Sequence, residues 1–90
     1  MGSFESRGEM LRNHAKGLVM EFMQSHPDCS SNSLGMRQAE IFRRCGFDWG
    51  DKPKATSSNQ QYWIVALLHE LEQEGMVIQI EESGPWKLME

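Results

Sequence analysis

Cysteine is scarce in this chain of 90 residues, and its spacing excludes two common kinds of small domain. The two cysteines, Cys29 and Cys45, do not form a CxxC pair. A disulfide-stabilised domain needs several cysteines, and a zinc finger needs closely spaced cysteine and histidine ligands. We therefore expect two free thiols and a fold that depends on its hydrophobic core.

Long apolar runs are also missing. No stretch approaches the roughly 18 apolar residues that a membrane-spanning helix needs. The opening residues MGSFESRGEM lack the continuous apolar segment of a signal peptide. We therefore expect a cytoplasmic protein without a membrane partner.

Motifs for catalysis and for metal binding are absent from the sequence. It shows no nucleophile paired with a base, no glycine-rich phosphate loop and no pair of catalytic carboxylates. His14, His26 and His69 fall on different predicted elements, without cysteine or carboxylate at ligand spacing. The sequence therefore predicts no enzyme, no cofactor, no metal site and no small-molecule substrate.

The length allows one small domain, which we place at residues 11–90 after a flexible segment, residues 1–10. A domain of this size buries only somewhat more than ~60% of the surface of its unfolded chain, and many such domains gain core by association. We therefore expect a homodimer. The first helix and the segment around Phe4 and Met10 are the predicted contacts, because Phe4 is otherwise a stray aromatic residue.

Charge is distributed unevenly along the chain, whose net charge is −4. Residues 35–58 carry five Lys or Arg against three Asp or Glu, whereas residues 69–90 carry one against six. Phosphate contact depends on local charge rather than on its total. Only the middle of the chain is therefore suited to contact nucleic acid.

Two helices are predicted in the first half. Apolar residues recur at helical spacing from Leu11 to Met23, and Pro27 should end this helix near Ser25. A second helix is predicted over residues 34–45, starting at Leu34, with Ser33 as its N-cap and Gly46 in the left-handed position after it. The broken residues 47–58 are predicted to form a long loop.

A third helix and a hairpin are predicted in the second half. The helix starts at Ser57 or Ser58, runs to Glu74 and stops at Gly75. Residues 76–80 and 85–89 alternate in polarity around a turn at residues 81–84, which indicates a β-hairpin. One core should contain Leu18, Phe22, Phe42, Ile64, Leu67, Leu71, Val77 and Trp86.

The order of three helices followed by a two-stranded hairpin resembles the winged-helix variant of the helix-turn-helix. The run from Leu67 to Val77 is similar to the end of the recognition helix and the entry to the wing in that superfamily, with Leu-x-x-Leu-x-x-x-Gly and two hydrophobic residues. The ending Gly84-Pro85-Trp86-Lys87-Leu88 also resembles the N-terminal winged-helix domains of Mrr-type restriction endonucleases. The resemblance implies a mainly α fold with a C-terminal wing, and double-stranded DNA as the partner.

In such a fold the N-terminal half of the third helix reads bases in the major groove. Asn and Gln side chains can hydrogen-bond adenine, and serine can meet several bases. The resemblance therefore points to Ser58, Asn59, Gln60 and Gln61 as base-reading residues. The cations expected to hold the DNA backbone are Arg37, Arg43, Arg44, Lys52 and Lys54.

Each of these assignments has a plainer alternative. The serine and asparagine residues could only cap the helix, and the arginines could belong to an ordinary solvated face. Glu81 and Glu82 in the predicted wing would repel phosphate, so either the wing faces away from DNA or the surface binds protein. The alternative function is a winged-helix module for protein interaction or dimerisation. Trp63 and Trp86 are expected in the core rather than in a stacking platform for single strands, whereas Trp49 lies in the predicted loop.

Overall fold

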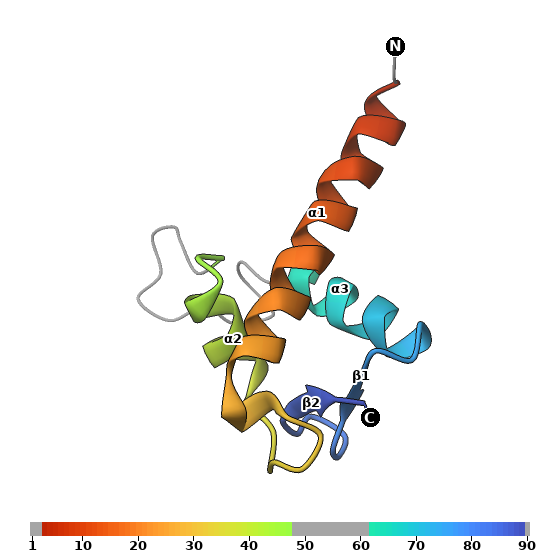
Figure 1. Ribbon diagram of the computed structural model, residues 1–90. Coiled ribbons are helices and arrows are strands. Elements are labelled where there is room, and N and C mark those ends of the chain that lie inside the picture. The colour runs from red at the N-terminus through yellow and green to blue at the C-terminus, as the bar shows by residue number, and fades with distance from the viewer. Residues whose placement is uncertain (1–2, 48–61, 90) are drawn as a thin grey trace.

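The computed structural model describes residues 3–47 and 62–89, and within them it contains the predicted series of three helices and a hairpin (Figure 1). A single-turn 3-10 helix, η1, follows α1. The elements are α1 (Phe4–Ser25), η1 (Pro27–Cys29), α2 (Gln38–Arg44), α3 (Tyr62–Gln73), β1 (Val77–Gln79) and β2 (Trp86–Leu88). A mainly helical chain with an antiparallel pair of strands near its C-terminus is thus confirmed.

Helix α1 is longer than the apolar pattern predicts. It begins at Phe4, because Ser3 accepts a hydrogen bond on its side-chain oxygen from the Ser6 N–H at 3.1 Å and so caps the first turn. The segment Phe4–Met10, which the sequence predicts to be flexible, is therefore helical. The end at Ser25 is as predicted, since His26 is extended before Pro27.

The start of α2 corrects the sequence prediction. The helix begins at Gln38 rather than at Leu34, which is 88% exposed. Gly35 adopts a φ of +86°, and the backbones of Met36 and Trp86 exchange two hydrogen bonds of 2.8 Å. Ser33 accepts from the Gly35 N–H at 3.0 Å and so stabilises a turn instead of capping a helix. The residues before α2 are therefore tied to the end of the chain as an isolated bridge.

The ends of α2 and α3 agree with the prediction. Gly46 and Gly75 have φ values of +77° and +78°, which glycine adopts without the steric cost that a Cβ brings. After α3, the Gly75 N–H donates to the Glu72 carbonyl and the Met76 N–H to the Leu71 carbonyl, both at 3.0 Å. The chain can therefore reverse directly from α3 into β1.

The hairpin also agrees with the prediction. Val77 pairs with Leu88, and Gln79 with Trp86. At the turn, the Ile80 N–H donates to the Pro85 carbonyl at 2.8 Å, and Ser83 has a φ of 62°. The turn at residues 81–84 therefore projects from the end of a short two-stranded sheet.

The core lies between the second half of α1, α2, α3 and the inner face of the sheet, as Figure 1 shows. The prediction that Leu18 belongs to the core is wrong, because this side chain is 40% exposed and lies outside the core. Phe22 is only partly buried and packs against the core, and the side chain of Ile64 lies outside the described residues. The main cluster consists of Val19, Met23, Cys29, Met36, Ile41, Phe42, Leu68, Leu71, Val77 and Trp86.

The predicted core members Phe42, Leu67, Leu71, Val77 and Trp86 are buried. Trp86 is fully inaccessible to solvent, which confirms its assignment to the core. The described helices include none that is both long and apolar enough to cross a membrane.

Candidate nucleic-acid interface

Helix α2 carries two arginines and one glutamate, and a third arginine directly precedes it. Arg43 and Arg44 both form ion pairs with Glu40, the latter at 2.8 Å between Nε and Oε2. The hydrogen bond from Arg44 holds the pKa of Glu40 below its ordinary value of 4.5. Arg37 immediately precedes the helix, is exposed, and forms no ion pair with another described residue. The α2 face therefore keeps a positive balance, although two of its cations share a carboxylate.

The glutamates of α3, and Glu74 directly after it, are engaged by other parts of the chain. Lys16 on α1 donates from Nζ to Glu70 Oε1 at 2.7 Å and to Glu74 Oε2 at 2.6 Å. These hydrogen bonds raise the pKa of Lys16 and lower that of Glu70. Arg12 Nε lies 3.7 Å from the second Glu70 oxygen. Both carboxylates are thus directed toward α1.

Glu72, the remaining glutamate of α3, is directed toward the hairpin. Its Oε2 accepts a hydrogen bond from the Gln79 N–H at 3.4 Å, and its Oε1 lies 3.6 Å from Nδ1 of His69. Ala66, His69 and Gln73 are exposed and spaced three and four residues apart. Since that spacing puts them on one face, α3 presents a solvent-facing side made of uncharged and histidine side chains.

Trp86 connects the elements around this side of α3. Its Nε1–H donates to Oε1 of Gln38, at the start of α2, over 3.4 Å. Its ring meets the His69 ring edge-on, with 5.3 Å between the centroids. The contacts of one buried indole therefore fix α2, α3 and β2 relative to one another.

A hollow of about 550 Å³ lies beside these contacts. It is bounded by the start of α2, the middle of α3 and the hairpin turn. Its lining residues are Arg37, Gln38, Ala39, Val65, His69, Gln79, Glu82, Ser83 and Gly84. The hollow thus brings Arg37 of the predicted backbone-binding set to the same surface as His69.

The hairpin brings negative charge to the edge of this surface. Glu81 and Glu82 are exposed at the turn. Lys87, the cation of the hairpin, donates from Nζ to the Ser31 carbonyl at 2.9 Å and is therefore used inside the chain. The acidic turn predicted from the sequence is thus exposed, and the ammonium group of Lys87 on β2 is directed to Ser31 instead.

Six predicted site residues lie outside the described residues. They are the four base-reading residues, Ser58, Asn59, Gln60 and Gln61, and the two lysines of the backbone-binding set, Lys52 and Lys54. Trp49 and the side chain of Trp63 are likewise outside. The three arginines of the predicted backbone-binding set, Arg37, Arg43 and Arg44, are on or next to α2. The structure therefore places the arginines and leaves the rest of the site as a prediction.

Sequence reasoning missed the link between Lys16 and the two α3 carboxylates. Its only sequence signal is the i, i+4 spacing of Glu70 and Glu74, which puts both on one helix face. The partner on α1 could not be read from that spacing. Without this link, two partly exposed carboxylates near the candidate interface would lose their cation.

Both cysteines are free thiols, Cys29 buried and Cys45 partly buried. Burial raises the pKa of each to about 11, so both remain protonated near neutral pH. Among the described residues, no group of three or more His, Cys, Asp or Glu side chains is arranged to hold a metal ion. The cysteines therefore belong to the packing of the domain.

Comparison with known proteins adds no family to this geometry. No protein-family model, curated protein or solved structure matches the chain. The functional conclusion therefore depends on the arrangement of the side chains around α2 and α3.

Proposed function

We propose that the chain is a winged helix-turn-helix domain that binds double-stranded DNA, with α3 in the major groove and the hairpin as its wing. The order of three helices and a hairpin supports this reading. A recognition helix needs a solvent-facing side, firm attachment to the core and a neighbouring helix that contacts phosphate. The described parts of α3 meet the first two requirements, and the arginines on and next to α2 support the third.

The observation that carries the proposal is the direction of the α3 carboxylates. A helix with three free glutamates on its outer face would repel the phosphates that line the groove. Here Glu70 and Glu74 bind Lys16, while Glu72 meets the hairpin backbone and His69. The outward side, with Ala66 and Gln73, therefore borders carboxylates that are partly exposed but already paired with a cation.

The arginines of α2 can serve phosphate in spite of their ion pairs. Exposed ion pairs between flexible side chains contribute little stability, because water and salt screen them. Arg43 and Arg44 can therefore exchange the single Glu40 carboxylate for phosphate oxygens at small cost. Arg37 needs no such exchange with a described partner.

The residues before Tyr62 complete the proposed site. Asn59, Gln60 and Gln61 would read bases through their amides, together with Ser58, while Lys52 and Lys54 would contact the backbone. The acidic turn at Glu81 and Glu82 would weaken binding wherever it approaches phosphate. The predicted complex is therefore one of modest affinity that depends steeply on salt.

The test is fluorescence anisotropy with labelled duplexes of random sequence at about 50 mM salt, where phosphate contacts are strongest. We expect binding by the wild-type chain, and a large loss of affinity in the double variant Arg37→Gln, Arg44→Gln. The logarithmic salt slope should fall by about 0.9 for each lost contact. Absence of binding at micromolar protein contradicts the proposal.

The control is Arg12→Gln, which removes one charge from an exposed side chain on α1 and is compared with the single variant Arg44→Gln. This variant should retain the wild-type affinity and salt slope. An equal loss in the control would show that only total charge matters, and it would contradict the assignment of α2.

A second candidate function, protein interaction through α1, has its own observation. Phe4 is 86% exposed and Leu11 72% exposed on a helix whose first half extends beyond the rest of the molecule (Figure 1). Large apolar side chains gathered on one projecting element are typical of an interaction surface. The nature of the partner follows from the charges on the same helix.

A further inference from the structure

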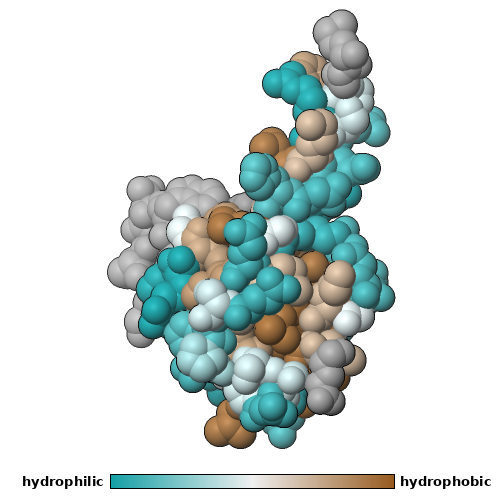
Figure 2. All heavy atoms as spheres, in the orientation of Figure 1, coloured by the Kyte–Doolittle hydropathy of each residue, from teal (hydrophilic) through white to brown (hydrophobic). Residues whose placement is uncertain are grey.

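The first half of α1 has few contacts with the rest of the described chain. Figure 1 shows it projecting beyond α3, and Figure 2 shows apolar side chains among the polar ones on its surface. Apart from the ion pair of Arg12 with Glu70, the attachment of α1 to the rest of the domain starts at Lys16 and continues through Val19 and Met23. The apolar residues before Lys16 are therefore not explained by the core of one copy.

An apolar series follows a seven-residue repeat along α1. Phe4, Leu11 and Leu18 recur at this interval, and all three are exposed. A repeat of seven keeps residues on the side of a helix that faces a second helix in a coiled coil. Beside this series runs a second one with the same interval, which consists of Arg7, His14 and Glu21. The two series together form a surface that we call the α1 seam.

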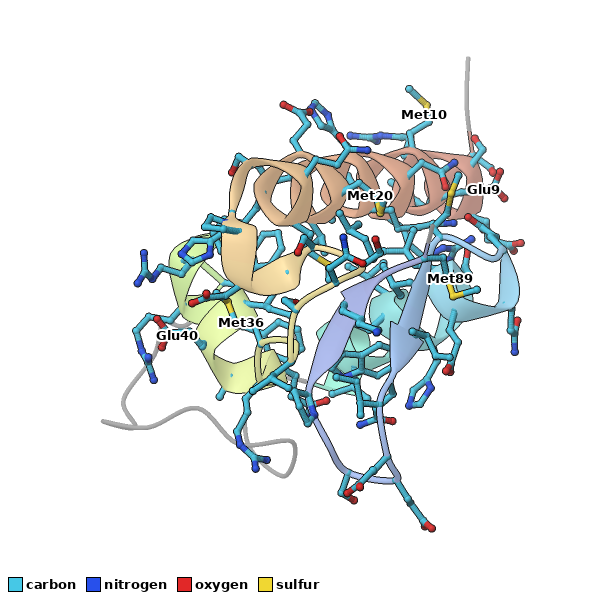
Figure 3. All side chains as sticks on the ribbon, turned by 60° about the horizontal axis from the view of Figure 1, so that its bottom comes forward. Glu9, Met10, Met20, Met36, Glu40 and Met89 are labelled. Atoms are coloured by element: carbon cyan, nitrogen blue, oxygen red, sulfur yellow. The ribbon has the colours of Figure 1, made fainter. Side chains whose placement is uncertain are left out.

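The α1 seam contains a hollow of about 320 Å³ lined by Arg7, Met10, Leu11 and His14. These residues have the spacing i, i+3, i+4 and i+7. Four residues with that spacing form the hole that receives one side chain of a facing helix in knobs-into-holes packing. Figure 3 shows Met10 on the side of α1 that faces away from α2 and the sheet, so the hole opens to solvent.

We propose that the α1 seam binds the α1 seam of a second copy of this chain in antiparallel orientation. The charges select both the partner and the direction. Parallel pairing would place Arg7 of one copy against Arg7 of the other, and Glu21 against Glu21. Both contacts bring like charges together and are repulsive. Antiparallel pairing brings Arg7 of each copy toward Glu21 of the other, and the two-fold axis creates this attractive contact twice.

The same orientation accounts for the hole. In an antiparallel pair, the hole beside Arg7 receives a side chain from the second copy. That side chain belongs to the same series as Arg7, which consists of Arg7, His14 and Glu21. Glu21 is the member of that series whose charge complements Arg7, and it forms no ion pair with another described residue of its own copy. Glu21 of the second copy therefore fits the hole beside Arg7.

The core of each copy leaves room for this contact. The buried face of α1 consists of Lys16, Val19 and Met23, whereas Leu18 and Glu21 are exposed on another side of the same turns. In the antiparallel pair, the projecting half of one α1 lies along the exposed side of the attached half of the other. The two domains then sit at opposite ends of the helix pair.

Sedimentation equilibrium of the full chain tests the proposal. We expect a dimer of two 10.4 kDa chains at micromolar concentration. Leu11→Asp should shift the protein to monomer, and because Leu11 is exposed, the circular dichroism spectrum should remain that of a folded domain. A single 10.4 kDa species of the wild type at up to about 100 µM, where even weak specific dimers form, would overturn the proposal.

Charge exchange tests the antiparallel orientation separately. Arg7→Glu and Glu21→Arg should each raise the dissociation constant at least tenfold, and the double variant should restore it. Glu9→Arg is the control, since Glu9 belongs to neither series of the seam. An unchanged dissociation constant in the two single variants would contradict the antiparallel pairing. So would a double variant whose dissociation constant does not return to that of the wild type.

Discussion

Lys16 of α1 and Glu70 of α3 lie 2.7 Å apart between Nζ and Oε1, and Glu74 Oε2 binds the same ammonium group at 2.6 Å. Lys16 is only 9% exposed, which is unusual for lysine. One cation thus binds two carboxylates at the C-terminal end of the proposed recognition helix and links that end to α1. Stability and binding should both depend on it.

Replacement of Lys16 by alanine should lower the melting temperature by roughly 4–8 °C, the effect of about 1 kcal/mol in a domain of this size. Glu74 would then lose its cation and Glu70 would keep only the longer contact with Arg12, so DNA affinity should also fall. Differential scanning calorimetry and anisotropy measure the two effects. The control is Arg12→Ala, since Arg12 lies at 3.7 Å from Glu70 and should have the smaller effect. A melting temperature unchanged in Lys16→Ala would contradict this role.

The contribution of Lys16 should also depend on pH. The pKa of Glu70 is lowered from 4.5 by Lys16, so this stabilisation is complete above about pH 4.5 and is lost as the pH falls through the lowered value. The pKa of Lys16 is raised from 10.5, so the stabilisation is lost again as the pH rises through that raised value. Chemical denaturation of wild type and Lys16→Ala should therefore give curves that converge at both extremes. A constant difference from pH 2 to pH 12 would contradict the link.

Two glycines should respond in opposite directions to alanine. At Gly35, where φ is +86°, a Cβ would lie 2.9 Å from the Trp86 carbonyl oxygen, so Gly35→Ala should cost more than ~1–2 kcal/mol. At Gly8, inside α1, a Cβ would meet nothing within 4 Å, so Gly8→Ala should stabilise by roughly 0.5–1 kcal/mol. Urea titration measures both free energies of unfolding. Equal stability of Gly35→Ala and wild type would contradict the steric role of Gly35.

The buried thiols should make stability fall in mild alkali. Burial raises the pKa of Cys29 and Cys45 to about 11 from 9.0, so folding retains protons that the unfolded chain releases. Their contribution is complete below about pH 9 and declines as the pH rises toward 11. Denaturant titrations at pH 8 and pH 10 should show this decline, and Cys29→Ala should reduce it. An identical decline in that variant would assign the effect to other groups.

The acidic wing turn should limit the affinity for DNA. Reversal of both charges, Glu81→Lys with Glu82→Lys, should strengthen binding to every duplex and raise the salt slope by up to about two units. The matched control is Glu5→Lys with Glu9→Lys, the same charge change on α1. Equal gains in both variants, measured by anisotropy, would contradict a position of the wing near phosphate.

Base reading should be distinguishable from backbone contact. Gln60→Ala or Gln61→Ala should cost roughly 1–3 kcal/mol on a preferred site selected from random duplexes, and nothing on unrelated duplexes. Arg44→Gln should instead weaken all duplexes alike. Uniform losses in the glutamine variants would remove them from the base-reading set.

Elements whose limits depend on local chemistry were predictable from the sequence. Pro27 ends α1, Gly46 and Gly75 follow α2 and α3, and the hairpin has the predicted turn. Each of these residues restricts its own backbone or its neighbour's, so no distant contact is needed to place the boundary.

Errors arose where a distant residue determines the outcome. Leu34 fits a helical apolar pattern, but the bridge between Met36 and Trp86 holds the chain extended there. Leu18 belongs to the stripe of α1, yet the position of α3 and the sheet selects Val19 and Met23 for burial. In the candidate site, the arginines of α2 could be chosen from composition, whereas the partner of Glu70 and Glu74 could not.

The bridge between Met36 and Trp86 also sets the order in which the domain can assemble. It joins the segment before α2 to the final strand, as does the bond from Lys87 to Ser31, whose partners are 56 positions apart. Contacts so distant in sequence bring little gain until the entropy of closing the intervening loop has been offset. The single helices and the β1–β2 hairpin, which are local in sequence, can therefore form early. The Met36–Trp86 bridge closes late, as does the contact of Lys16 with Glu70, whose partners are 54 positions apart. During synthesis, the surface beside α2 and α3 acquires its final shape only after Trp86 has left the ribosome.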